Sequence, residues 1–143
     1  MKKIFPFLLF VAFSLNAVAI DHPGLTSAQI SSDRFILIEN GEPVPIIVSA
    51  DDDVAVLRAA ANLQNDFMMV SGKRPELAHT PSGRRIVIAG SLKSEIIRSL
   101  VGKQLLDVTS LEGCNEKYQI SFVKNPVEGV EEALVIAGSD RRG

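Results

Sequence analysis

The sequence has 143 residues, a length that fits one domain, and its 46% hydrophobic and 22% charged residues are those of an ordinary globular chain. Its formal net charge of −2 gives no bulk attraction to nucleic acid or to an anionic membrane. The basic residues are scattered, and one Tyr and seven Phe leave few side chains to stack on bases. Composition therefore argues against a nucleic-acid partner.

The first stretch, "MKKIFPFLLFVAFSLNAVAIDHPG", has the three parts of a secretory leader. Lys2 and Lys3 form a positive start, residues 4–15 are apolar, and Ala17-Val18-Ala19 places small residues at a cleavage site. The apolar run is shorter than a membrane span, and no cysteine stands at the cleavage site of the kind a lipoprotein needs. We predict that residues 1–19 are a signal peptide. The mature chain is expected to be exported, periplasmic or secreted, with no membrane association after cleavage.

The next segment is predicted to be an entry arm followed by a hairpin. Residues 20–34 are polar and include Pro23 and Gly24, which favours an extended arm. Residues 35–38 and 44–48 are apolar enough for two strands, and Asn40-Gly41 is a hairpin turn dipeptide. The prolines in "EPVPII" lack backbone donors, so the returning strand is expected at a sheet edge.

The strongest helix signal follows the hairpin. Five apolar residues recur every three or four positions and predict one buried helix face: Val56, Ala60, Leu63, Phe67 and Val70. Ser49 is the expected cap, and Asp51, Asp52 and Asp53 are expected in the first turn, where the helix dipole favours negative charge. A calcium loop would need alternating acidic residues with a Gly and a distant Glu, which this run lacks. Gly72 is the expected end of the helix.

The second half of the chain contains an internal echo, "IVIAGS" at 86–91 and "LVIAGS" at 134–139. Residues 86–89 predict a buried strand, Ser91 a cap, and residues 92–101 a helix. The alternation in "YQISFV" predicts a half-buried strand, and residues 133–137 predict another buried one. We expect an α/β (α+β) domain over residues 35–143, a small mixed β-sheet with two helices and partly parallel strands. By analogy with the first copy, Ser139 and Asp140 should begin a linking helix, at whose start the domain would be cut.

No motif identifies an active site. The Gly-Ser turns lack the glycines of a dinucleotide fingerprint and the Gly-Lys-Ser/Thr of a P-loop, and there is no Gly-x-Ser-x-Gly or His-Glu-x-x-His. Cys114 stands alone, with only His22 and His79 as basic partners for a nucleophile, so a structural role is favoured. Candidate carboxylates for a glycosidase pair are scattered over helix faces and turns, namely Asp66, Glu76, Asp107, Glu112 and Glu128. We predict no catalytic, cofactor-binding or metal-binding residue, and no cofactor.

Three segments together resemble a known family. "FILIENGEPVPIIVSADDDVAVLRAAANLQNDF", "LEGCNEKYQISFV" and the closing "ALVIAGSDRRG" are similar to the amino-terminal region of glycoside hydrolase family 115, the xylan α-1,2-glucuronidases. The resemblance covers residues 35–143, and "AGSDRRG" is its most specific part. In that family a small α/β domain precedes a (β/α)8 barrel.

The resemblance implies a function for the whole enzyme. Its reaction would remove (4-O-methyl)glucuronic acid side chains from glucuronoxylan, with inversion, using acidic residues of the barrel. None of those residues matches a position here, so the chain is expected to be inactive alone and to meet glucuronoxylan or its oligosaccharides only through the barrel. The alternative is a non-catalytic polysaccharide-binding or accessory module, which should expose aromatic side chains for sugar stacking.

Overall fold

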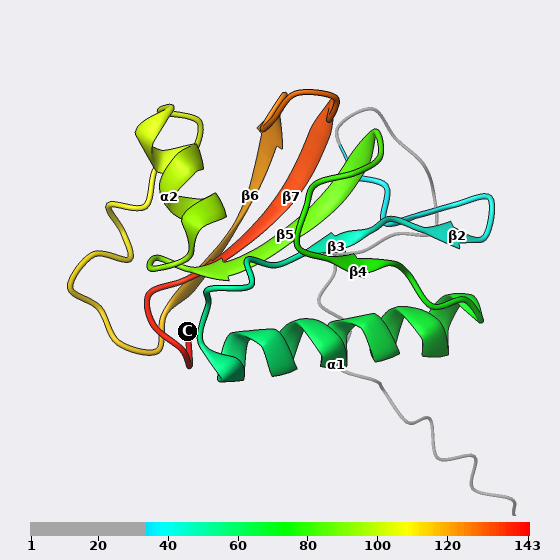
Figure 1. The fold of residues 1–143 in the computed structure, drawn as a ribbon, viewed down its shortest axis with the longest axis horizontal. Coiled ribbons are helices and arrows are strands. Elements are labelled where there is room, and N and C mark those ends of the chain that lie inside the picture. The colour runs from blue at the N-terminus through cyan, green and yellow to red at the C-terminus, as the bar shows by residue number, and fades with distance from the viewer. Residues whose placement is uncertain (1–33) are drawn as a thin grey trace, which may run out of the picture. The chain divides into compact units, whose positions relative to one another are not determined.

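The computed structural model describes residues 34–143 as two helices, a five-stranded mixed sheet and a small two-stranded sheet (Figure 1). This confirms the predicted α+β class with a small mixed β-sheet. The predicted signal peptide and all but the last residue of the predicted arm lie outside the described residues.

The predicted hairpin forms, but it is shorter than expected. Strands β1 (Ile38–Glu39) and β2 (Glu42–Pro43) pair antiparallel around Asn40 and Gly41, whose positive φ angles of 53° and 76° suit a tight hairpin turn. The chain then leaves this pair and forms β3 (Ile46–Ile47) in the larger sheet. The expectation of an edge strand was wrong, because β3 lies between two strands. Pro45 precedes it and contributes only its carbonyl, which accepts from the N–H of Val87.

The larger sheet has the order β4-β3-β5-β7-β6, built from β4 (Leu77–Ala78), β5 (Arg85–Ser91), β6 (Tyr118–Lys124) and β7 (Glu132–Gly138) around β3. The first four strands in this order are parallel and β6 is antiparallel to β7. The two echoed segments are neighbours, with Ile88 opposite Val135. Continuous apolar runs suit β5 and β7 because both are internal strands with helix or loop on their faces.

Helix α1 (Val54–Ser71) packs on one face of this sheet and starts later than predicted. Asp53 is its N-cap and accepts from the N–H of Ala55, so no aspartate occupies the first turn and Ser49 is not the cap. Gly72 ends the helix with a φ of 74°, as expected. The predicted face is largely right, with two buried residues, Ala60 and Phe67, and two half-buried ones, Val56 and Leu63.

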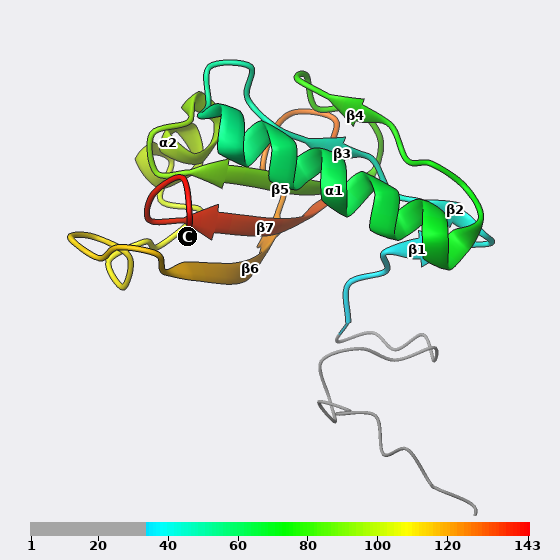
Figure 2. The same ribbon diagram turned by 90° about the horizontal axis from the view of Figure 1, so that it is seen from below.

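The prediction that Val70 belongs to the buried face of α1 was wrong. Val70 is 79% exposed, whereas Ser71 is half-buried and its hydroxyl donates to the carbonyl of Phe67. Figures 1 and 2 show the carboxyl end of α1 extending beyond the ends of β5 and β7. The short hairpin of β1 and β2 lies beside this end of the helix instead of the large sheet, and Val70 stays exposed although its spacing fits the stripe.

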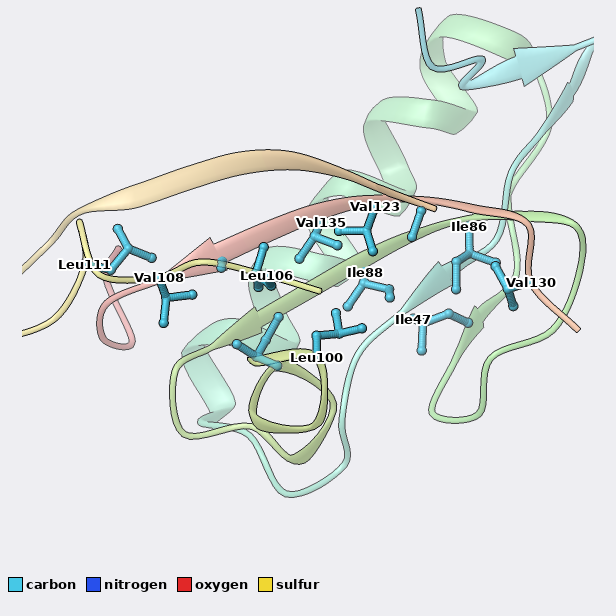
Figure 3. Packing of buried hydrophobic residues seen from close by; sticks show 13 residues of the cluster. Ile47, Ile86, Ile88, Leu100, Leu106, Val108, Leu111, Val123, Val130 and Val135 are labelled. Atoms are coloured by element: carbon cyan, nitrogen blue, oxygen red, sulfur yellow. The ribbon is translucent and has the colours of Figure 1, made fainter. Parts of the chain in front are cut away.

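Helix α2 (Glu95–Gly102) lies on the opposite face of the sheet (Figure 3). Its N-cap is Ser94 rather than Ser91, which is the last residue of β5. Ile97 and Leu100 enter the core together with Leu106 and Leu111 of the following loop. The helix approaches β5 closely, since a Cβ at position 90 would lie 2.6 Å from Ser94 Oγ, which explains the glycine there.

One part of the sheet face on which α1 packs is left uncovered by the helix. Tyr118, Ile120 and Phe122 project from β6 on this face and are 63%, 50% and 48% exposed, and we call them the β6 strip. Ile120 lies opposite Ile136 and Phe122 opposite Leu134, which are both only half-buried. Phe35 reaches one end of the strip and packs edge-on against Phe122 at 6.2 Å between ring centroids. The alternation in "YQISFV" was read correctly as a strand, but its buried residue is Val123.

Candidate functional site

A polar crevice lies at the carboxyl ends of the parallel strands. Strands β3 and β5 are neighbours, yet the helices that follow them lie on opposite faces of the sheet. Such a divergence is where open α/β sheets bind ligands. A crevice of about 470 Å³ occupies this position. It is lined by the last residue of β5 and by residues that follow β3, β5 and β7: Asp51, Asp52, Asp53, Ser91, Lys93, Asp140, Arg141 and Arg142.

Asp52 ties the two sides of this crevice together. Its carboxylate accepts from the backbone N–H of Ser91 at 2.8 Å, from the Ser91 hydroxyl at 2.7 Å, and from the N–H of Asp53 at 2.8 Å. The side chain is buried, with 8% of its residue surface exposed. Because the bonds join the loop after β3 to the end of β5, Asp52 holds the two strand ends in place.

The other acidic residues of the crevice are also engaged. Asp53 caps α1, and Asp51 lies 3.7 Å from the guanidinium of Arg98. Asp140 accepts from the backbone N–H groups of Glu116 and Arg142, at 3.1 and 2.8 Å, and from that of Gly143. The N–H groups of Arg142 and Glu116 hold the pKa of Asp140 below its ordinary value. Asp140 therefore bonds like an N-cap residue.

The basic residues of the crevice balance much of this charge. Arg142 pairs with Glu116 at 2.9 Å, and Lys93 and Arg141 lie at the exposed rim. The carboxylates thus serve as acceptors for backbone and hydroxyl donors. A glycosidase general acid needs a raised pKa, and the lowered pKa of Asp140 is the opposite. In the described residues the crevice offers polar contacts but no pair of carboxyl groups set up for acid–base catalysis.

The described residues do not bring Cys114 and His79, which were singled out from the sequence, into one site. His79 bonds through Nδ1 to the carbonyl of Val48 at 2.8 Å, which anchors the end of β4 beside β3. Cys114 lies in the loop before β6, with its thiol 3.6 Å from the carbonyl of Ser110. His22 is outside the described residues.

The candidate carboxylates are equally dispersed. Asp107 accepts from the hydroxyl and N–H of Thr109, which lower its pKa, and Glu76 reaches Ser82 at 3.4 Å. Glu128 lines a separate, shallow crevice of about 510 Å³ near the β6–β7 turn. Asp66 and Glu112 lie exposed on α1 and on the loop before β6. None of the five lines the crevice at the strand ends.

Sequence reasoning missed the Asp52–Ser91 contact. The available signal was the position of "SADDD" and "GS" directly after two apolar strand segments, because the carboxyl ends of neighbouring parallel strands meet at one edge.

Within residues 34–143, no group of three or more His, Cys, Asp or Glu side chains is arranged to hold a metal ion. Neither helix of the described part is long and apolar enough to cross a membrane.

Comparison with models of known protein families finds no match, and comparison with curated proteins finds none either.

Proposed function

We propose that this chain is the leading, non-catalytic domain of an exported xylan α-1,2-glucuronidase of glycoside hydrolase family 115. The proposal starts from the three segments that resemble the amino-terminal region of that family. A small α+β domain with helices on both faces of a mixed sheet agrees with the type of domain expected there. Export rests on the leader-like residues 1–19.

The proposed non-catalytic role rests on the hydrogen bonds that the carboxylates at the strand ends accept. Glycoside hydrolysis by the common mechanism needs two carboxyl groups flanking the bond, one of them a proton donor. Here Asp52 has three donors on its carboxylate and Asp140 has three backbone N–H groups on its own. Both carboxylates are engaged as hydrogen-bond acceptors within the domain, which favours a structural role for it rather than catalysis.

The association of this domain with a catalytic region tests the proposal. The chain is mixed with a family 115 glucuronidase from which the leading domain has been deleted, and the mixture is analysed by size exclusion and thermal melting. We expect co-elution and a raised melting temperature of the catalytic part, because a binding partner stabilises the native state. An unrelated α+β domain of similar size is the control. Separate elution with an unchanged melting temperature would contradict the proposal.

A second function has one observation in its favour. Tyr118 and Phe122 are 63% and 48% exposed on the same face of β6, and exposed aromatic rings are the groups expected to stack on sugars. A polysaccharide-binding module would be retarded in gels containing glucuronoxylan. Tyr118→Ala and Phe122→Ala should then abolish the retardation, and Val70→Ala, at another exposed apolar position, should leave it unchanged. Unretarded migration of the unmodified chain would remove this alternative.

A further inference from the structure

Within residues 34–143, no strand pairs with the outer edge of β6. This strand is the last in the sheet order and pairs with β7 alone among the described strands. Figure 2 shows it as the outermost strand of the sheet. Every second residue of an edge strand directs an unpaired N–H and C=O outward, so such an edge is a template for another strand.

This edge has few of the features that normally block pairing. All seven residues of β6 are in continuous register with β7, from Tyr118 opposite Gly138 to Lys124 opposite Glu132. A bulge would interrupt that register, and neither Pro nor Gly occurs in "YQISFVK". The only charges are Lys117, just before the strand, and Lys124 at its end. A seven-residue edge with an apolar face is long enough to accept a partner strand.

The sequence of β6 is complementary to itself when two copies run antiparallel. With Ile120 placed on a two-fold axis, Ile120 lies opposite its own copy and Tyr118 lies opposite Phe122 of the second copy. On the other face Gln119 would meet Ser121. Aromatic and β-branched cross-strand pairs of this type stabilise antiparallel sheets.

The alternation of the two faces also fixes this register. Tyr118, Ile120 and Phe122 share one face of β6, and Gln119 and Ser121 share the other. A shift of one residue would point each apolar side chain of one copy to the polar face of the other.

We propose that this chain associates with a second copy of itself through antiparallel pairing of β6 with β6, centred on Ile120, to give one continuous ten-stranded sheet. The inference is independent of the proposed glucuronidase role. Edge-to-edge pairing flanks the half-exposed β6 strip without covering its face, so it removes at most on the order of 300 Å² of side-chain surface per copy, at about 200 Å² for each large side chain. Stable interfaces bury about 800 Å² per partner, so this dimer is weak and depends on protein concentration.

The association is measured by sedimentation equilibrium of the full chain from about 5 to about 500 µM, the range suited to an interface of this size. We expect a monomer–dimer equilibrium. Ile120→Lys places two ammonium groups opposite each other and should lower the association constant at least about tenfold. Val70→Lys, at an exposed apolar position on α1, is the matched control and should leave it unchanged.

Two cysteine variants test the register itself. In a Cys114→Ser background, Ile120→Cys should cross-link faster in air than Ser121→Cys, since directly opposite residues have Cβ atoms about 4.5–5.5 Å apart, close to the range that a disulfide spans. The two copies of Ser121 are offset by about 7 Å along the strands, which is too far for direct cross-linking.

Three results would overturn the inference. One is a monomer over the whole concentration range. Another is equal cross-linking of the two cysteine variants. The third is association that Ile120→Lys does not weaken relative to Val70→Lys, since that dimer would use another surface.

Discussion

Replacing Asp52 by Asn tests whether one buried carboxylate joins the two halves of the parallel sheet. The carboxylate accepts from Ser91 N–H through one oxygen, and from the Ser91 hydroxyl and Asp53 N–H through the other. An amide of the same shape presents one oxygen and one NH₂ group. In either orientation its NH₂ group faces a backbone N–H, so one buried donor loses its acceptor, and the remaining bonds lose their charge.

The expected loss of unfolding free energy follows from these hydrogen bonds. An orphaned buried donor costs about 1–3 kcal/mol, and hydrogen bonds to a charged group are worth about 1 kcal/mol more than neutral ones. Asp52→Asn should therefore lower the free energy of unfolding by about 2–4 kcal/mol. Asp51→Asn is the matched control, because Asp51 is exposed and its pairing with Arg98 at 3.7 Å should be worth less than about 1 kcal/mol.

Urea unfolding followed by circular dichroism measures both variants. A double-mutant cycle with Ser91→Ala should show coupling between Asp52 and Ser91 well above about 0.5 kcal/mol, the scatter of independent sites. Equal losses for Asp52→Asn and Asp51→Asn, or additive losses in the cycle, would refute the reasoning that Asp52 bridges the two strand ends.

Other regions give further tests. Phe67→Ala should cost about 3–5 kcal/mol in urea melts because Phe67 is buried against the sheet, whereas Asn62→Ala on the exposed face should cost well under about 1 kcal/mol. Asp140 has a folded-state pKa below its ordinary value of 3.8, so it adds stability above that pH, and this stability is lost as pH falls further. Asp140→Asn should thus lower the melting temperature at pH 7 and have no effect well below pH 3.8; an effect that persists in acid would contradict this assignment. Mass spectrometry of exported protein should find Ile20 at the amino terminus after cleavage following Ala19, whereas an intact leader on membrane-bound material would contradict export.

Regular elements could be predicted where the local signal and the tertiary context agree. The two echoed apolar runs became β5 and β7, side by side and parallel, because such runs need cover on both faces. The Asn40-Gly41 turn formed for a purely local reason, since both residues adopt the positive φ that the turn requires. Helix α1 was found from its periodicity, and Gly72 ended it as expected.

The predictions that were wrong concern features set by contacts between residues distant in sequence. The cap of α1 moved from Ser49 to Asp53 because Asp52 is drawn to Ser91, 39 positions away, and the helix starts after that contact. The returning hairpin strand joined the interior of the larger sheet because Pro45 has to supply only an acceptor there. The crevice at the strand ends was not predicted, since it needs the order of β3, β5 and β7, which no single segment encodes.

The most direct test of the central proposal is release of (4-O-methyl)glucuronic acid from glucuronoxylan. Two proteins are compared at equal concentration: this chain alone, and a chimera in which it replaces the leading domain of a family 115 glucuronidase. A leading non-catalytic domain should give no release alone and turnover close to that of the parent enzyme in the chimera. Turnover by the chain alone would contradict the account, because it would place the acid and base within these 143 residues.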